Sequence, residues 1–385
     1  TLIVPLIYVK KLGTFMIVGV PRERKTLEKR VALTPDGAAA LVKRGHKVLI
    51  EQNAGAGSFF EDKLYTDVGC QIVPTLKDIW TKSDMVVKVK EPHESEYEFF
   101  RPGLILFDYL HLASMPDVTE AMLKGGVTGI AYELVQLADG RLPLLEPMSE
   151  VAGRLSVLNG ANYLLSQHNG RGVLLGGTVG VPPAEVVIVG AGIAGRGACE
   201  MAAGSGAHVT VLDIDYSKLE RIRTEFGAGV TTIHSTPGSL ARAVANADLL
   251  IGAVLVPGAA APKIITRDMV KNMKKGAVFV DISIDQGGCA ETIKPTSLDA
   301  PVFTEDGVIH YGVCNMPAQT PRTSTMALTA ATLPYVMKLA DSGLAALESS
   351  KPLRNALNTH NGLLTNELVS KAVSIKYTAI EQALR

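Results

Sequence analysis

The chain contains little cysteine, which argues against two kinds of covalent or metal cross-link. Its 385 residues include four cysteines, and no two of them form a C-x-x-C pair. Cysteines scattered in this way are typical of a protein from a reducing compartment, so we expect a cytoplasmic location. The pattern predicts neither a disulfide framework nor a structural zinc site, and we expect no metal. The cysteines are Cys70, Cys199, Cys289 and Cys314.

Charge and apolar runs disfavour two more classes of protein. Basic and acidic residues number 38 each, so the formal net charge is zero and nothing is basic enough to follow a phosphate backbone. No apolar run approaches the length needed to cross a bilayer. We therefore expect neither a nucleic-acid partner nor a membrane span. The length allows two domains, each with its own core.

The first 15 residues, TLIVPLIYVKKLGTF, differ from the regular pattern that begins at Met16. A signal peptide places its basic residues before its apolar ones, whereas here the apolar residues come first, which argues against secretion. We expect residues 1–15 to be a translated extension or an expression remnant that lies outside the fold.

A glycine-rich unit at residues 186–215, VVIVGAGIAGRGACEMAAGSGAHVTVLDID, organises the chain. Its first apolar run predicts a buried strand, and Gly190, Gly192 and Gly195 follow in the spacing G-x-G-x-x-G. In such a unit the first glycine permits a tight turn, the second lets the backbone approach a pyrophosphate, and the third lets helix and strand pack closely. The pyrophosphate then binds free N–H groups at the helix N-terminus.

The acid that ends this unit indicates which dinucleotide binds. Asp213 lies 23 residues after Gly190, where it is placed to accept hydrogen bonds from the adenine-ribose diol. A 2′-phosphate would meet a like charge there, and residues 214–217 contain no arginine to receive it. We therefore predict NAD rather than NADP. A lone glycine motif also occurs in close-packed units without a cofactor, but strand, glycines, helix, second strand and acid together favour the cofactor.

The rest of the chain alternates apolar runs with helical patterns, as expected for parallel β-α-β units. Thr34 and Pro35 supply an N-cap and a first-turn proline for a helix that we expect to stop at Gly45. Further helices are predicted at residues 76–80, 117–124, 218–226, 240–245, 269–274 and from 324 onward. Strands are predicted at residues 17–20, 47–51, 72–73, 85–89, 104–110, 129–133, 230–233, 249–254 and 277–282. The expected fold class is α/β with two doubly wound domains.

Pro143 and Pro147 interrupt the alternation and mark the expected domain boundary. Ser149 is positioned to cap a long helix that runs towards Gln167. We expect the helical C-terminal part to cross back to the first domain. The prediction is a discontinuous substrate domain at residues 16–143 and 323–385 and a Rossmann NAD-binding domain at residues 144–322.

Polar residues follow several of the predicted strands, at the ends where open α/β sheets bind ligands. In the first half these residues are Arg30, Lys90 and His111, and in the second half they are Asp213 and Asp285. Their coincidence in both halves predicts one cleft between the two domains.

Each of these residues also has a plain structural interpretation. Arg30 lies among six other charges and, taken alone, is typical of a solvated loop, and Lys90 fits a surface lysine equally well. The alternative for His111 is a hydrogen-bonded core histidine, and for Asp285 it is an Asx turn. Cys289 has no activating neighbour in the sequence and is expected to be structural.

Together with their surroundings, these residues closely resemble the L-alanine dehydrogenase family from Met16 to roughly the C-terminus. EKRVALTP surrounds Arg30, VKVKEP contains Lys90, and LHLA contains His111. The likeness continues, in order, through LPLLEPMSEVAGRL, GRGVLLGG, GAGIAG, IGAVLVPGAAAPK, DISIDQGG and YGVCNMPAQTPRTST.

The resemblance implies a role for each matching residue. Arg30 and Lys90 are expected to hold the substrate carboxylate, and His111 and Asp285 are expected to be the catalytic pair. A homohexamer is implied as well. Contacts to NAD are implied at Ser149, Ile193, Asp213, Ser235, Val254, Leu255, Ile282, Asp285, Asn315 and Met316, beside the three glycines.

The implied reaction is reversible oxidative deamination, in which L-alanine, NAD and water give pyruvate, ammonium and NADH. The planar fork of Arg30 suits a carboxylate, and Lys90 adds a second charge and a hydrogen bond to the pyruvate carbonyl. Histidine titrates nearest neutrality, so His111 suits proton transfer. Asp285 suits deprotonation of the attacking water and balances the cationic iminium.

Two other functions stay open at this stage. The NAD-binding subunit of proton-translocating transhydrogenase shares the fold but lacks the catalytic constellation, and it typically carries glutamate at the position of Asp285. A saccharopine-type or other imine-forming dehydrogenase would use the same chemistry on a larger second substrate. An assay of NADH formation across small L-amino acids separates these functions.

Overall fold

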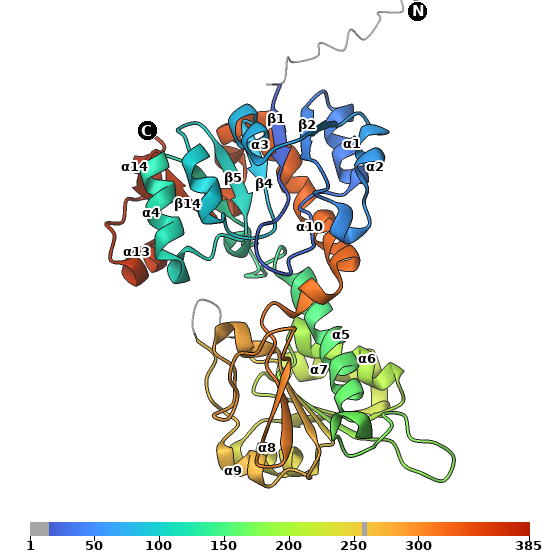
Figure 1. Cartoon of the computed structure of the whole chain (residues 1–385). Helices are drawn as coiled ribbons and strands as arrows, with labels where there is room; N and C mark the ends of the chain where they lie inside the picture. The colour runs from blue at the N-terminus through green and yellow to red at the C-terminus, as the bar shows by residue number, and fades with distance from the viewer. Residues whose placement is uncertain (1–14, 256–259) are drawn as a thin grey trace, which may run out of the picture. The chain divides into compact units, whose positions relative to one another are not determined.

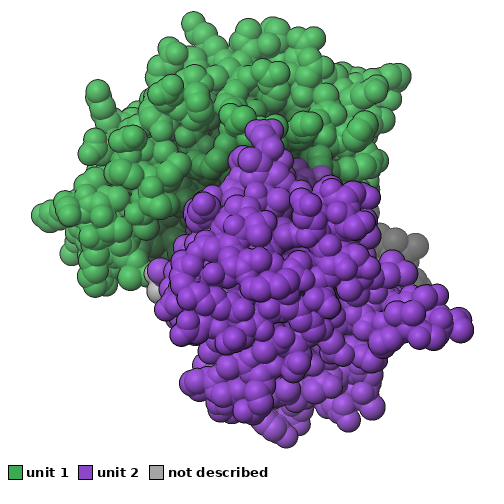
Figure 2. Space-filling view, turned by 60° about the horizontal axis from the view of Figure 1, so that its bottom comes forward, with its two compact units in different colours: residues 1–147, 320–385 green, residues 148–319 purple. Residues whose placement is uncertain are grey.

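The computed structural model describes residues 15–255 and 260–385. They belong to two compact units, unit 1 within residues 1–147 and 320–385 and unit 2 within residues 148–319 (Figures 1 and 2). Apart from Phe15, the extension predicted at residues 1–15 lies outside the described residues.

Unit 1, green in Figure 2, is built on a mostly parallel sheet. Among the described residues its eight strands lie in the order β15-β14-β6-β5-β4-β1-β2-β3, and β14 runs antiparallel to both of its neighbours. The strands are β1 (Ile17–Val20), β2 (Lys47–Glu51), β3 (Gln71–Val73), β4 (Met85–Val87), β5 (Ile105–Asp108), β6 (Thr128–Ala131), β14 (Leu357–His360) and β15 (Leu363–Leu364).

The helices of unit 1 begin at positions that local chemistry explains. The hydroxyl of Thr34 accepts a hydrogen bond of 3.2 Å from the N–H of Gly37, and Pro35 takes the first helical position. The cap and the proline therefore act as predicted. The helices are α1 (Pro35–Lys43), α2 (Asp62–Thr66), α3 (Leu76–Lys82), α4 (Pro116–Gly125), α10 (Pro321–Ser342), α11 (Ala346–Ser349), α12 (Lys351–Asn355), α13 (Glu367–Val373) and α14 (Ile380–Ala383).

Unit 2 is built on a second mostly parallel sheet, with the strand order of a doubly wound fold. In the part of the chain that the structure describes, its seven strands lie in the order β12-β13-β11-β10-β7-β8-β9, with only β12 antiparallel. The strands are β7 (Glu185–Val189), β8 (His208–Asp213), β9 (Val230–His234), β10 (Leu249–Gly252), β11 (Val278–Asp281), β12 (Val302–Glu305) and β13 (Val308–Tyr311). The helices are α5 (Glu146–Tyr163), α6 (Ile193–Gly204), α7 (Tyr216–Phe226), α8 (Pro237–Asn246) and α9 (Arg267–Lys271). The expected two-domain α/β class is confirmed.

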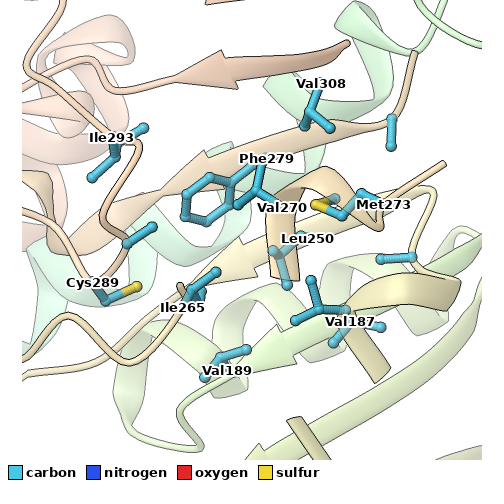
Figure 3. Packing of buried hydrophobic residues seen from close by; sticks show 14 of the residues in the cluster. Val187, Val189, Leu250, Ile265, Val270, Met273, Phe279, Cys289, Ile293 and Val308 are labelled. Carbon is cyan, nitrogen blue, oxygen red and sulfur yellow. The ribbon is translucent and has the colours of Figure 1, made fainter. Parts of the chain in front are cut away.

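A hydrophobic core holds the sheet of unit 2 together (Figure 3). Val187, Leu250 and Phe279 come from three neighbouring strands and pack with Ile265, and none of the four is more than 3% exposed. Cys289 lies in the same cluster, and burial raises the pKa of its thiol well above the ordinary value. The thiol therefore stays protonated and serves as a packing group, as expected.

The prediction that Ser149 caps a helix reaching Gln167 is wrong. The helix α5 begins at Glu146 and ends at Tyr163, so Ser149 lies inside its first turn. Pro147 explains the earlier start, because the first turn tolerates a residue with fixed φ and no N–H. Gln167 belongs instead to a separate 3₁₀ turn at residues 166–168.

Several strands end earlier than the apolar runs indicated. The strand β4 ends at Val87, β5 ends at Asp108 and β10 ends at Gly252. The residues that follow, including Lys90 and His111, therefore lie in loops. There a side chain is no longer restricted to one of the two faces of the sheet.

Candidate functional site

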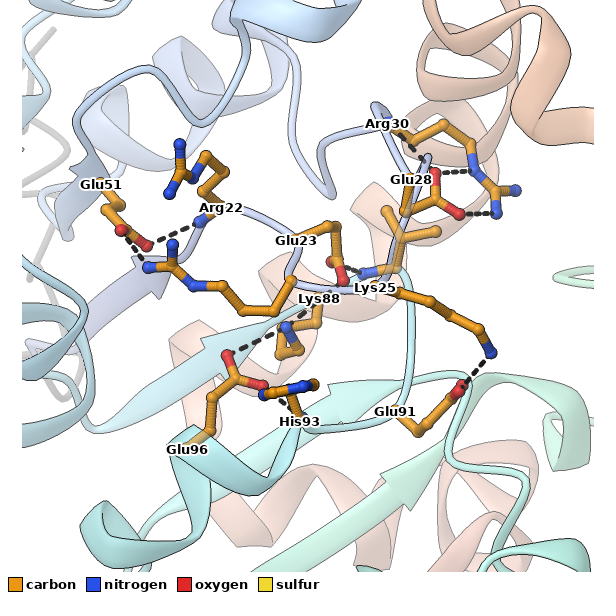
Figure 4. Close-up of polar contacts among 12 residues, drawn as sticks. Arg22, Glu23, Lys25, Glu28, Arg30, Glu51, Lys88, Glu91, His93 and Glu96 are labelled. Atoms are coloured by element: carbon orange, nitrogen blue, oxygen red, sulfur yellow. Dashed lines mark hydrogen bonds and ion pairs between the residues drawn. The ribbon is translucent and has the colours of Figure 1, made fainter. Parts of the chain in front are cut away.

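Arg30 is buried in unit 1 against a carboxylate. Its Nε donates to Oε1 of Glu28 at 2.7 Å and its Nη2 donates to Oε2 at 2.5 Å, and the Arg30 side chain is 2% exposed (Figure 4). A solvated loop charge is thereby excluded. Burial alone would lower the pKa of Arg30, but the contact with Glu28 outweighs it and holds the pKa above its usual value. The guanidinium plane is fixed, and the group stays charged.

A pocket of about 400 Å³ opens beside this pair. Loop residues from 22–30 and 53–57 line it, including both Glu28 and Arg30, whereas Lys90 and His111 are not part of the lining. The pocket thus contains the predicted carboxylate-binding arginine, but neither the predicted carboxylate-binding lysine nor the predicted catalytic histidine of unit 1.

A buried charge cluster underlies the loop that carries Lys90. The ammonium group of Lys88 lies 3.3 Å from Oε2 of Glu23 and 3.1 Å from Oε1 of Glu96, and its side chain is 1% exposed (Figure 4). Burial would lower the pKa of Lys88, but the surrounding carboxylates, Asp108 included, raise it above the ordinary value. The other oxygen of Glu23 accepts a 2.6 Å hydrogen bond from the N–H of Val89, next to Lys90. The cluster therefore fixes the backbone that presents Lys90.

His111 is held by an acid that the sequence did not single out. It lies three residues after β5, its side chain is 39% exposed, and its backbone N–H donates to Oε1 of Glu133 at 2.7 Å. The exposure excludes a fully buried core histidine. Glu133 was expected at the end of a strand, but β6 ends at Ala131 and Glu133 lies in a 3₁₀ turn.

The glycine turn of unit 2 has the geometry that a pyrophosphate requires. Gly190 has φ +107, and a side chain there would meet the carbonyl oxygen of Ala253 at 2.3 Å. A side chain at Gly195 would meet the carbonyl oxygen of Gly190 at 1.8 Å. Gly192 forms the N-cap of α6 and has open space where its side chain would be. The turn is tight on its inner side and open at the helix N-terminus, as dinucleotide binding requires.

Asp213 ends β8 beside this turn. Its Oδ2 accepts a hydrogen bond of 2.7 Å from the N–H of Ala191, and its Oδ1 accepts one of 2.9 Å from the N–H of Asp215. Asp213 is 9% exposed, whereas the following Ile214 is 77% exposed. The predicted ribose-binding acid is therefore preorganised by the same turn that fits a pyrophosphate.

Asp285 lies in a short 3₁₀ turn after β11. Its Oδ1 accepts a hydrogen bond of 3.0 Å from the backbone N–H of Asn315, a residue with φ +55. The bond joins two loops that are 30 residues apart, which differs from the local bond of an Asx turn. The nearby Ser283 links this turn to the segment that follows β10. Its Oγ accepts a hydrogen bond of 3.0 Å from the N–H of Val254 and donates one of 2.7 Å to the carbonyl of Val254.

Most of the predicted cofactor residues gather at one edge of unit 2. The strands β11, β10, β7, β8 and β9 are parallel neighbours in that order, so their carboxyl ends lie side by side. Ser149 does not follow a strand but lies in the first turn of α5, a helix that packs closely on α6 at Gly153 and Ala194. The residues at or after the strand ends are Gly190, Gly192, Ile193, Gly195, Asp213, Ser235, Val254, Leu255, Ile282 and Asp285, with Asn315 and Met316 after β13.

Among the described residues, no helix combines the length and the apolar character of a membrane span. Nor do those residues bring three or more histidine, cysteine, aspartate or glutamate side chains together in a way that could hold a metal ion.

Comparison with known proteins covers nearly the whole chain. Residues 19–152 match the profile described as alanine dehydrogenase/PNT, N-terminal domain, and residues 156–367 match the C-terminal domain of the same family. An alanine dehydrogenase from Mycolicibacterium smegmatis is 52% identical over 370 residues, which are 96% of this chain and all of that protein. One from Methanococcus maripaludis is also 52% identical, over 371 residues, with the same coverage of both chains.

Solved structures give the same result. An L-alanine dehydrogenase superposes with a TM-score of 0.91 at 48% identity, covering 93% of this chain and 99% of that one. A transhydrogenase from Sinorhizobium meliloti superposes with a TM-score of 0.78 at 23% identity, covering 91% and 99%, and this likeness shows the fold alone. The chain therefore belongs to the alanine dehydrogenase/PNT family.

Proposed function

We propose that this chain catalyses the reversible, NAD-dependent oxidative deamination of L-alanine to pyruvate and ammonium. The observation that carries the proposal is the 52% identity to an alanine dehydrogenase over 96% of this chain and the whole of that relative. Because the alignment covers 96% of this chain, both of its units are matched by the relative. The transhydrogenase alternative has weaker support, at 23% identity to the solved structure.

The edge of unit 2 supports NAD as the cofactor. The open helix N-terminus at Gly192 suits a pyrophosphate, and the carboxylate of Asp213 suits a ribose diol rather than a 2′-phosphate. Bound NAD would supply the hydride acceptor for the substrate Cα–H. Ser235, Val254 and Ile282 follow β9, β10 and β11 at the same edge of the parallel sheet and would complete the binding surface.

We assign the substrate carboxylate to Arg30 and Lys90. Glu28 already fixes the guanidinium plane of Arg30, so little conformational freedom is lost when a carboxylate binds. Glu23 fixes the backbone just before Lys90 in the same way. Two positive groups whose positions are held in this way suit the carboxylate of a small substrate such as alanine or pyruvate.

We assign the proton transfers to His111 and Asp285. His111 keeps a partly exposed imidazole, so it has access to a substrate and to water. Asp285 can deprotonate the water that attacks the iminium and can balance the positive charge of that intermediate. The two residues lie in different units, and the proposal requires both to act on one substrate.

We also propose that the chain forms a homo-oligomer, a hexamer as its family resemblance implies. A cytoplasmic location suits its four free cysteines, Cys70, Cys199, Cys289 and Cys314. Light scattering on the purified chain measures the assembly directly.

The test is NADH formation by the purified chain from NAD and L-alanine, with D-alanine, glycine and L-serine as comparisons. In the reverse direction, pyruvate and NADH are assayed with ammonium and then with L-lysine as the amine. We expect turnover with L-alanine and with ammonium. NADH binding without alanine turnover would favour a transhydrogenase-type subunit, and a preference for L-lysine would favour an imine-forming dehydrogenase.

A further inference from the structure

The carboxylate of Glu133 accepts hydrogen bonds from two successive backbone amides, those of Leu110 and His111. Its Oε1 accepts from the N–H of His111 at 2.7 Å, and its Oε2 accepts from the N–H of Leu110 at 3.3 Å. The same Oε1 lies 3.9 Å from Nδ1 of the His111 imidazole. One carboxylate therefore faces both the backbone and the ring of the predicted acid–base residue.

The sheet explains why the two residues meet. β5 and β6 are parallel neighbours, and their last residues, Asp108 and Ala131, are paired in register. His111 follows three residues after the first strand, and Glu133 follows two residues after the second. The contact is therefore built into adjacent strand ends and does not depend on a long loop.

The backbone of His111 needs this support. Its φ is +50 and its ψ is 31, a left-handed conformation that few residues other than glycine adopt. Such a conformation persists only where the surroundings over-determine it, and it is frequent at functional sites. The bond from the His111 N–H to Glu133 is part of that surrounding structure.

Aromatic residues near the same strand ends contact the imidazole ring of His111. The imidazole of His111 stacks on Tyr109 with ring centroids 5.9 Å apart and planes 5° apart. Tyr109 in turn meets Tyr132 edge to face at 5.1 Å, and its hydroxyl donates to the carbonyl of Leu144. Tyr132 precedes Glu133 in the chain, so one short turn supplies both a carboxylate and an aromatic support.

We propose that Glu133 is a positioning residue for the reaction, acting through His111. The carboxylate holds the histidine backbone in its left-handed conformation and lies 3.9 Å from Nδ1 of the ring. Nε2 is then the ring nitrogen that is left to exchange a proton with the substrate. The inference rests on the proposed function, in which His111 transfers protons.

The test is a double-mutant cycle on alanine deamination with four proteins: wild type, Glu133→Gln, His111→Ala and the double variant. Glutamine has one acceptor oxygen in place of two, so the two amides can no longer be held by separate oxygens, and the charge is lost. We expect Glu133→Gln to lower kcat about ten- to hundredfold, as part of the hundred- to ten-thousandfold that general acid–base catalysis supplies. The KM for alanine and the affinity for NADH should change little.

In the His111→Ala background the same glutamine should have almost no further effect on kcat, because residues that act as a unit are not additive. Glu133→Asp retains the charge and should recover part of the activity lost in Glu133→Gln. Glu120→Gln, at an exposed position on α4, is the matched control and should behave as wild type. Thermal unfolding of each variant shows whether it is folded.

Three outcomes would overturn the inference. If Glu133→Gln turns over normally while His111→Ala is inactive, Glu133 has no positioning role and the proposed function stands. If Glu133→Gln costs the same factor in both backgrounds, Glu133 acts independently of His111. If His111→Ala itself turns over normally, the acid–base assignment of the proposed function fails, and the role of Glu133 fails with it.

Discussion

The carboxylate of Asp213 accepts a hydrogen bond of 2.7 Å from the backbone N–H of Ala191, the residue between Gly190 and Gly192. The acid predicted to recognise the ribose therefore also supports the glycine turn. Each carboxylate oxygen can accept more than one hydrogen bond, so these contacts leave capacity for a diol. A substitution that removes the acceptor would disturb the turn as well as the recognition.

Replacing Asp213 by asparagine and Ile214 by arginine should shift the cofactor preference towards NADP. Asparagine keeps an oxygen for the N–H of Ala191 but removes the charge that repels a 2′-phosphate. Ile214 is 77% exposed, so an arginine there need not disturb the core. A hydrogen bond to a charged group contributes about 1.5–3 kcal/mol, so the ratio of kcat/KM for NADP to that for NAD should rise about ten- to hundredfold. Ile214→Arg alone is the control, and efficient use of NADP by the wild type would contradict the assignment.

Arg30→Lys should weaken alanine and pyruvate binding while leaving NADH affinity nearly unchanged. Lysine keeps a positive charge but cannot present a planar fork to a carboxylate. We expect KM for pyruvate to rise about ten- to hundredfold, which corresponds to about 1.4–2.8 kcal/mol. Initial-rate kinetics and a fluorescence titration with NADH measure the two effects separately.

The control for this variant must address Glu28, which loses two donors when Arg30 is replaced. The double variant Arg30→Lys with Glu28→Gln should recover thermal stability without recovering pyruvate binding. Arg221→Lys, on the exposed face of α7, controls for the exchange itself. Equal loss of NADH and pyruvate binding would show that Arg30 has a cofactor or folding role instead.

The regular part of the fold was predictable because its apolar runs are long and fully buried. The strands β1, β2 and β7 lie where those runs predicted them, with one residue more at the start of β7. The hairpin β12–β13 and the strands β14 and β15 were missed. β12 is only partly buried and β15 has two residues, so neither gives a clear periodic signal. The start of α5 was not predicted because Ser149 and Pro147 both suit the beginning of a helix, Ser149 as a cap and Pro147 as a first-turn residue.

The supporting residues of the candidate site were not predictable in the same way. Arg30, Lys90, His111 and Asp285 were found from their places after strands and from family resemblance. Glu28 and Glu133 carry no comparable signal, because an acid in a loop is ordinarily a solvated charge. The role of Glu28 depends on its burial against Arg30, and that of Glu133 depends on the backbone amides of Leu110 and His111. These contacts become visible only when the fold places the strand ends beside one another.

Lys88→Met should destabilise unit 1 strongly. Lys88 pairs with the buried Glu23 and Glu96, and its charge partly opposes the burial that raises the pKa of Asp108 well above the ordinary value. Removing one partner of a buried ion pair typically costs about 3–5 kcal/mol, because a charge stays buried without compensation. Thermal or urea unfolding measures the loss. KM for alanine should also rise in any folded fraction, because Glu23 then holds Val89 less firmly.

Lys82→Met is the matched control for this exchange. Its ammonium group pairs with Asp78 on the surface of α3 and its side chain is 57% exposed, so its loss should change stability little. Near-wild-type stability of Lys88→Met would show that the cluster is not held together by charge.

His310 should make unit 2 less stable as the pH falls. Its ring is fully buried, its Nδ1–H donates to the carbonyl of Val308 at 3.0 Å, and its Nε2 lies 2.9 Å from the hydroxyl of Thr292. Burial lowers the pKa of His310 below its ordinary value. The neutral tautomer satisfies both ring nitrogens, and a charged ring would lie in a core beside Phe279 and Phe303.

The direction of the effect follows from proton counting. Below the unfolded-state pKa of about 6.5 the unfolded chain binds a proton that the folded chain does not, so stability falls as the pH falls. The loss from one such group is at most about 1.4 kcal/mol per pH unit and continues down to the lowered folded-state pKa. His310→Phe with Thr292→Val keeps an aromatic ring at this position and removes the titrating group. We expect the unfolding midpoint of this variant to change less than that of the wild type between about pH 7.5 and 5.5, on either side of that pKa. The burial of His360 lowers its pKa too, but that residue is present in both proteins, so the difference between them isolates His310. An equal acid shift in both proteins would remove His310 as a source of acid sensitivity.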